Sequence, residues 1–131
     1  MKGFFSHLEE EVRKNSNFRK VLYTGHHSQL VLMSLLAGEE IGMEVHPDND
    51  QFFRFDQGEG KVIVDGNEYE VKDGDAVLVP AGAEHNVINT GSEPLRFYTI
   101  YSPPHHKDGI VRETKKEAEE QAAEFDGETT E

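Results

Sequence analysis

Residues 44–51 read EVHPDNDQ and interrupt an otherwise apolar stretch, with IGM on one side and FFRF on the other. Because side chains alternate between the two faces of a strand, Glu44 and His46 are expected on one face. Residues 47–50, PDND, are of turn-forming types, and this length is enough for a hairpin connection. Such a hairpin would bring Gln51 beside Glu44 and His46, so that three potential metal ligands converge on one face.

A fourth potential ligand is His85, which follows PAGAE far along the chain. If its strand lies on the same inner surface, the set comprises two imidazoles, one carboxylate and one amide oxygen. Such a set suits one divalent transition metal ion, Fe, Mn, Ni, Zn or Co, and leaves room for water or substrate. The alternative is a metal-free barrel in which His46 and His85 are ordinary polar residues and the nearby glycines and Pro80 only form turns.

Short apolar stretches separated by turn residues fill positions 18–102. The expected strands are FRKVLYT, SQLVLMSLL, IGMEVH, QFFRF, GKVIVDG, NEYEV, DAVLVP, HNVINT and LRFYTIYS. Asp65-Gly66-Asn67, between two of them, is a strong signal for a tight hairpin. Many short strands with no helices between them predict an all-β domain, either an antiparallel sandwich or a barrel.

Two spaced motifs resemble those of the cupin superfamily. The first runs Gly38, five residues, Glu44, one residue, His46, four residues, Gln51, six residues, Gly58; the second runs Gly74, five residues, Pro80, one residue, Gly82, two residues, His85, three residues, Asn89. The second agrees with the family pattern at every defined position. In the first, Glu44 and Gln51 stand where the family usually has histidine and glutamate. The resemblance implies a double-stranded β-helix (a jelly roll, or cupin barrel) with a metal ion inside one mouth, held by Glu44, His46, Gln51 and His85.

The resemblance also implies an activity. The chain looks like a small single-domain metal-binding cupin of the mannose-6-phosphate isomerase-like kind (cupin type 2), because the family's sugar-phosphate isomerases likewise combine Gln, Glu and two His. A metal-dependent enzyme, isomerase-like or dioxygenase-like, is therefore expected. One carboxylate and a divalent ion leave a formal charge of about +1, which favours a small polar or anionic oxygen-rich substrate such as a sugar derivative. The alternative is a non-catalytic small-molecule binding or sensor cupin.

Strand parity assigns further residues to the barrel interior. Phe53 and Phe55 share parity with Gln51, and Val87 shares parity with His85, so these three are expected inside as core or as substrate contacts. No basic cluster is expected near the ligands, since Arg54 has the opposite parity, and this weakens the case for a sugar phosphate.

The face opposite the ligands is apolar, because it carries Ile41, Met43 and Val45. Such a face needs a cover, either the N-terminal helix or a second subunit. Cupins commonly pair through sheet faces of this kind, so the resemblance implies a homodimer.

Composition restricts the remaining choices. A chain of 131 residues is the length of one domain, and its formal net charge of −13 disfavours nucleic acid or an anionic membrane as partner. A small-molecule substrate or ligand is expected instead. The absence of cysteine excludes disulfides, thiolate zinc sites and cysteine nucleophiles. No apolar run reaches the length of a signal-peptide core or a membrane span, which favours a cytoplasmic protein.

Three segments are expected: an N-terminal helical segment (1–17), the cupin barrel (18–111) and an acidic tail (112–131). In the first, Ser6 and Glu9 could form a capping box for a helix over 6–15. The tail has eight acidic and three basic residues. It is expected to be solvated or frayed, although its middle is rich in helix formers. The pairs His26-His27 and His105-His106 are expected as exposed loop residues, with a second metal site as the alternative.

Overall fold

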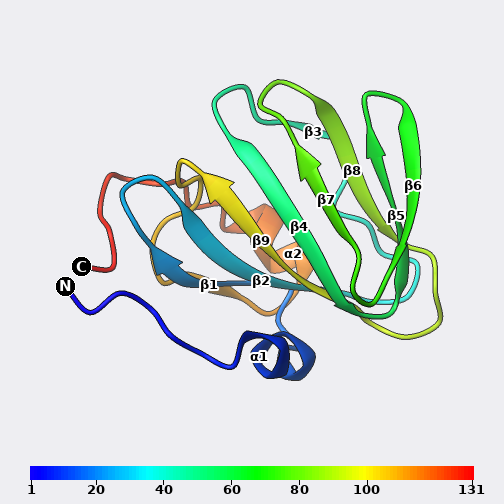
Figure 1. Cartoon of the computed structure of the whole chain (residues 1–131), viewed down its shortest axis with the longest axis horizontal. Coiled ribbons are helices and arrows are strands. Elements are labelled where there is room, and N and C mark those ends of the chain that lie inside the picture. The colour runs from blue at the N-terminus through cyan, green and yellow to red at the C-terminus, as the bar shows by residue number, and fades with distance from the viewer.

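Two antiparallel β-sheets form the molecule, and the computed structural model describes all residues 1–131. One sheet has six strands in the order β10-β1-β2-β9-β4-β7, and the other has four in the order β3-β8-β5-β6 (Figure 1). The elements are α1 (Leu8–Lys14), β1 (Arg19–Thr24), β2 (Gln29–Leu35), β3 (Glu44–Val45), β4 (Asp50–Gln57), β5 (Glu59–Val64), β6 (Asn67–Lys72), β7 (Ala76–Val79), β8 (Glu84–Asn89), β9 (Leu95–Ser102), β10 (Val111–Arg112) and α2 (Lys115–Glu120). The predicted all-β jelly roll is confirmed.

The core lies between the two sheets and follows the alternation of the strands. Along β9 every second side chain is buried, so Phe97, Thr99 and Tyr101 face the interior. Phe53 and Phe55 of β4 are fully buried, and both rings contact Phe97, with centroids 5.8 and 5.1 Å away. These rings form an apolar floor behind the polar residues at one mouth of the barrel.

The predicted tight hairpin joins β5 to β6. Val64 pairs with Asn67, and both residues between them have positive φ, 46° at Asp65 and 81° at Gly66. Two consecutive positive φ angles are the signature of a type I′ turn, which suits the twist of the flanking strands. Gly58 of the first motif has a different role, because a Cβ there would lie 2.6 Å from the carbonyl oxygen of Pro94.

The hairpin predicted around residues 47–50 is wrong. β3 pairs only with β8 of the four-stranded sheet, whereas β4 pairs with β7 and β9 of the other sheet. Residues 47–50 therefore cross from one sheet to the other. Hydrogen bonds fix this crossing, since Asn49 Nδ2 donates to the Pro103 carbonyl (2.6 Å) and Asp50 Oδ1 accepts from the Ala81 amide (2.9 Å).

The N-terminal helix begins later than predicted and packs elsewhere. α1 starts at Leu8, and its N-cap is His7 with no side-chain capping bond, so the Ser6 capping box is wrong. Val12 is fully buried, and the helix lies against β4 and β9. It does not cover the face beside β3, where Met43 is 51% and Val45 50% exposed.

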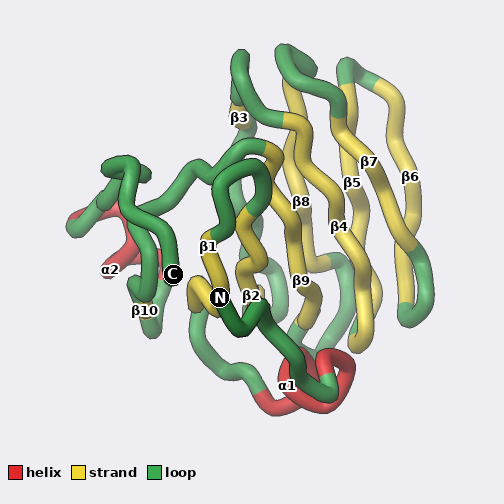
Figure 2. The backbone as a smooth tube through the Cα atoms, turned by 60° about the vertical axis from the view of Figure 1, so that its left-hand side comes forward, coloured by secondary structure: helices red, strands yellow, loops and turns green.

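The acidic tail follows the barrel surface and is mostly exposed, in agreement with a solvated tail, and its middle forms the helix α2 rather than a frayed segment. Thr114 caps α2 by accepting from the Glu117 amide (3.1 Å), and Ala118 is buried. Beyond α2, the Phe125 amide donates to the His105 carbonyl (3.0 Å). Figure 2 shows this segment beside β1 and β10, with the two termini close together. Neither helix is long and apolar enough to cross a membrane.

Candidate metal centre

The four predicted ligands come from both sheets and meet at one end of the barrel. Glu44 of β3 and His85 of β8 are direct cross-strand partners, and His46 follows β3 by one residue. Gln51 belongs to β4 in the facing sheet. The crossing at residues 47–50 thus carries the chain from two of these side chains to a third across the barrel.

Two close pairs make up the group. His46 Nε2 lies 3.0 Å from Glu44 Oε2, and His85 Nε2 lies 3.2 Å from Gln51 Oε1. One donor atom from each of Glu44, His46 and His85 lies within 4.8 Å of the others. Ligand bonds of about 2.0–2.1 Å to one ion place neighbouring donor atoms about 3.0–3.4 Å apart. The two close pairs have this spacing, and the 4.8 Å limit keeps Glu44, His46 and His85 near enough to hold one ion together.

The orientation of His85 and Gln51 fits an ion as well. His85 Nδ1–H donates to the Ala83 carbonyl (3.0 Å), which leaves a lone pair on Nε2. Gln51 Nε2 donates to the Thr99 hydroxyl (3.0 Å), which turns its Oε1 toward His85. In this tautomer His85 Nε2 and Gln51 Oε1 are both acceptors, and a metal ion between them would satisfy both.

Glu44 supplies the negative charge of the group. Burial by itself would raise the pKa of this carboxyl, but the hydrogen bond from His46 and the positive charges nearby lower the pKa below its usual value. Glu44 is therefore ionised at neutral pH, as a metal ligand must be.

Two histidines that were predicted to be exposed lie at the same mouth, so that prediction is wrong. The ring of His105 lies 4.3 Å from that of His46 and stacks on Tyr101 at 5.2 Å. His106 is buried, and its Nε2 lies 3.2 Å from the Tyr101 hydroxyl. Burial lowers the pKa of both histidines, that of His106 to about 2. Both histidines belong to the segment SPPHHKDG at the end of β9, which folds back over the mouth of the barrel. The C-terminal tail holds this segment there, since the Phe125 amide donates to the His105 carbonyl.

The other predicted residues have simpler positions. Phe53, Phe55 and Val87 are fully buried behind the site, which favours their role as core. His26 and His27 are exposed, as predicted. Asn89 ties down the turn that follows β8, since its Nδ2 donates to the Glu93 carbonyl (2.9 Å) and its Oδ1 accepts from the Gly91 amide (2.9 Å).

A pocket of about 220 Å³ opens beside Glu44, and it contains basic residues that the sequence analysis missed. Arg54 indeed points away from the ligands, toward Asp56 at 3.6 Å. Arg19 of β1, however, lines this pocket together with Lys115, and two acidic residues balance them, so that no basic cluster forms. The complete lining is Phe18, Arg19, Ile41, Glu44, Lys115, Ala118, Glu119 and Ala122.

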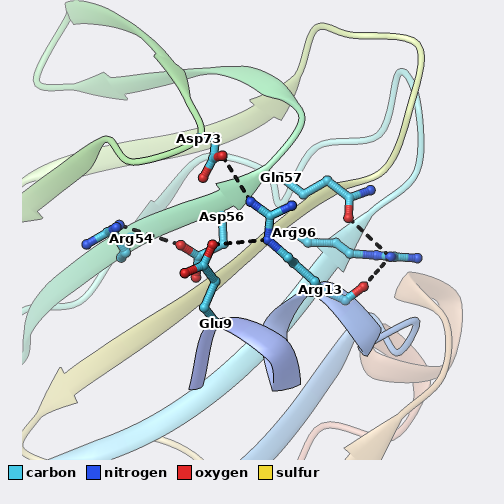
Figure 3. Close-up of polar contacts among 7 residues, drawn as sticks. All are labelled: Glu9, Arg13, Arg54, Asp56, Gln57, Asp73 and Arg96. Carbon is cyan, nitrogen blue, oxygen red and sulfur yellow. Dashed lines mark hydrogen bonds and ion pairs between the residues drawn. The ribbon is translucent and has the colours of Figure 1, made fainter. Parts of the chain in front are cut away.

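A second acidic group lies near α1, but arginines already neutralise it. Carboxylate oxygens of Glu9, Asp56 and Asp73 lie within 4.8 Å of one another. Arg13 bonds to Glu9 (3.2 Å) and to Asp73 (3.0 Å), and Arg54 pairs with Asp56, as Figure 3 shows. We interpret this group as an ion network in which Arg13 fastens α1 to the turn between β6 and β7.

Comparisons with known proteins agree with this architecture. The sequence model of the cupin domain matches residues 31–101. A crystal structure of BH2720 from Bacillus halodurans is 44% identical, with a TM-score of 0.90, and the match covers 92% of this chain and 96% of that one. The uncharacterised protein YrkC of Bacillus subtilis is 46% identical over 123 residues, which are 89% of this chain and 66% of YrkC. This chain therefore spans about two thirds of the length of YrkC.

A more distant relative has a described ligand. The oxalate-binding protein of Thermotoga maritima is 28% identical over 68 residues, which are 52% of this chain and 56% of that protein.

Proposed function

The chain belongs to the cupin family, and from this premise we propose that it is a metal-dependent enzyme acting on a small, oxygen-rich, polar or anionic substrate. The metal would be one divalent transition metal ion held by Glu44, His46, Gln51 and His85. The observation that carries the proposal is the pair of facing acceptors, His85 Nε2 and Gln51 Oε1, at 3.2 Å. A metal ion between these two atoms would bind both without turning either group.

A bound ion would supply Lewis acidity for an isomerase-like reaction or oxygen activation for a dioxygenase-like one. The protein's own contribution is to fix the donor atoms. Ala83 sets the tautomer of His85, and Thr99 sets the direction of the Gln51 amide. Loss of turnover in the absence of O₂ would favour the dioxygenase-like reaction and count against the isomerase-like one.

The first experiment measures metal content. We expect about one equivalent of a divalent transition metal in the purified protein by elemental analysis, and less than a tenth of that in the His46→Ala/His85→Ala variant. His26→Ala/His27→Ala is the matched control, because it removes two exposed histidines away from the site. Full metal content in His46→Ala/His85→Ala would refute the site.

The second candidate function is a non-catalytic binding or sensor protein. The oxalate-binding relative from Thermotoga maritima supports it, since the name of that protein describes binding alone. This function predicts that a ligand raises the melting temperature of the metal-loaded protein while no product forms. If any ligand that stabilises the protein is converted to a product, the protein is an enzyme and the non-catalytic function is refuted.

A further inference from the structure

Arg19 is the one arginine whose guanidinium takes part in no hydrogen bond and no ion pair. Its Nε is shielded from solvent and has no acceptor, as is also true of the Nε atoms of Arg54 and Arg96. Arg13, Arg54, Arg96 and Arg112 each bond or pair with another residue. A shielded guanidinium nitrogen without an acceptor is costly, so a ligand that provides acceptors would bind there with a gain.

The position of Arg19 points this group toward the candidate metal centre. Arg19 and Glu44 line the same pocket. The ring of Phe18 lies 5.3 Å from the Arg19 guanidinium carbon and supports it from one side.

Without a metal ion, the two basic and two acidic side chains that line the pocket have a formal net charge of zero. Arg19 and Lys115 are basic, while Glu44 and Glu119 are acidic, and Lys115 Nζ lies 3.9 Å from Glu119. A divalent ion at Glu44 would give the lining an excess positive charge in a molecule whose net charge is −13. An anion would then be favoured at this place on the surface.

The size and walls of the pocket define the ligand further. Its volume of about 220 Å³ is below the range of about 300–1,000 Å³ that is usual for drug-sized ligands. Phe18, Ile41, Ala118 and Ala122 provide apolar walls, two of them from the C-terminal segment. A small organic acid with a short carbon skeleton matches these dimensions better than a phosphorylated sugar.

We infer that Arg19, with Lys115 from α2, forms a subsite for the carboxylate of a small organic acid whose other oxygen atoms reach the metal centre. The inference rests on the proposed function and adds the substrate class to it. A guanidinium fork holds a carboxylate through two parallel hydrogen bonds, which fixes the orientation of the acid. The folded tail is thereby a wall of the substrate pocket.

Binding of small acids to the metal-loaded protein tests the inference. The probes are oxalate, malonate, lactate and succinate, each compared with its amide, which is uncharged but similar in size. We expect at least one acid to bind by calorimetry and its amide to bind about tenfold or more weakly. Arg19→Gln should lower the affinity for the acid by about tenfold or more, and Arg19→Lys should lower it by less. The metal content by elemental analysis should stay the same in both variants.

The control is Lys20→Gln, which removes one positive charge from the next residue of β1, outside this pocket. It should leave acid binding unchanged. Equal loss in Lys20→Gln and Arg19→Gln would overturn the subsite, because the effect would then come from net charge. A protein that holds metal but binds none of the acids would overturn the subsite alone, and a protein without metal would overturn the proposed function together with it.

Discussion

At the scale of single residues, the site depends on where its one carboxylate stands. Glu44 pairs with His46 on the four-stranded sheet, and the neutral Gln51 faces His85 from the other sheet. The family's usual arrangement has histidine in the first place and glutamate in the second. In this chain the carboxylate therefore lies on the side of Arg19, and the amide lies on the side of the aromatic floor.

Gln51→Glu tests whether position 51 is a ligand. A second carboxylate should raise the affinity for a divalent ion by about tenfold or more, which adds about 1.4 kcal/mol to the stabilisation by saturating metal. The measurement is the difference in melting temperature between Mn(II)-loaded and EDTA-treated protein. Gln57→Glu, on the same strand but beside Arg96, should leave this difference as it is. An unchanged or smaller difference in Gln51→Glu would mean that residue 51 does not contact the ion.

At the scale of elements, local sequence patterns predicted the strands and turns whose conformation depends on residues close in the sequence. The alternation in QFFRF and LRFYTIYS identified β4 and β9 because one face of each strand is buried. The turn at Asp65-Gly66 was predictable because its backbone conformation depends on those two residues.

Long-range pairing was not predictable in the same way. Residues 47–50 have the composition of a hairpin, but β3 pairs with β8 and leaves β4 to the other sheet. The fold of the tail depends on contacts such as Phe125 with His105, which no spacing in the sequence reveals. The structure still brings the four predicted residues together, because both arrangements place them inside the same barrel.

The attachment of α1 offers a test at this scale. Val12 is fully buried, whereas the Arg13 ion pairs are largely exposed. Val12→Ala should therefore lower the free energy of unfolding by about 1–3 kcal/mol, and Arg13→Ala by less than about 1 kcal/mol. Urea unfolding of both variants measures the two losses. A larger loss in Arg13→Ala would show that the ion network of Figure 3, and not apolar packing, holds the helix.

At the scale of the whole molecule, charge and exposed apolar surface act against each other. The net charge of −13 opposes the association of two copies, yet Met43 and Val45 leave about half of their surface in water beside β3. α1 lies on the other sheet and leaves this face open. The homodimer implied by the family resemblance would cover it.

We therefore predict a dimer that strengthens with ionic strength, because salt screens the repulsion between acidic subunits while apolar burial persists. Light scattering at micromolar concentration, at low and at high salt, measures the mass. Val45→Glu should give a monomer in both conditions, because it places a charge in the proposed interface. Leu78→Glu adds the same charge at an exposed position on β7 and should leave the dimer intact. A wild-type protein that is monomeric at both salt concentrations, or a dimer that only Leu78→Glu disrupts, would rule out this face as the interface.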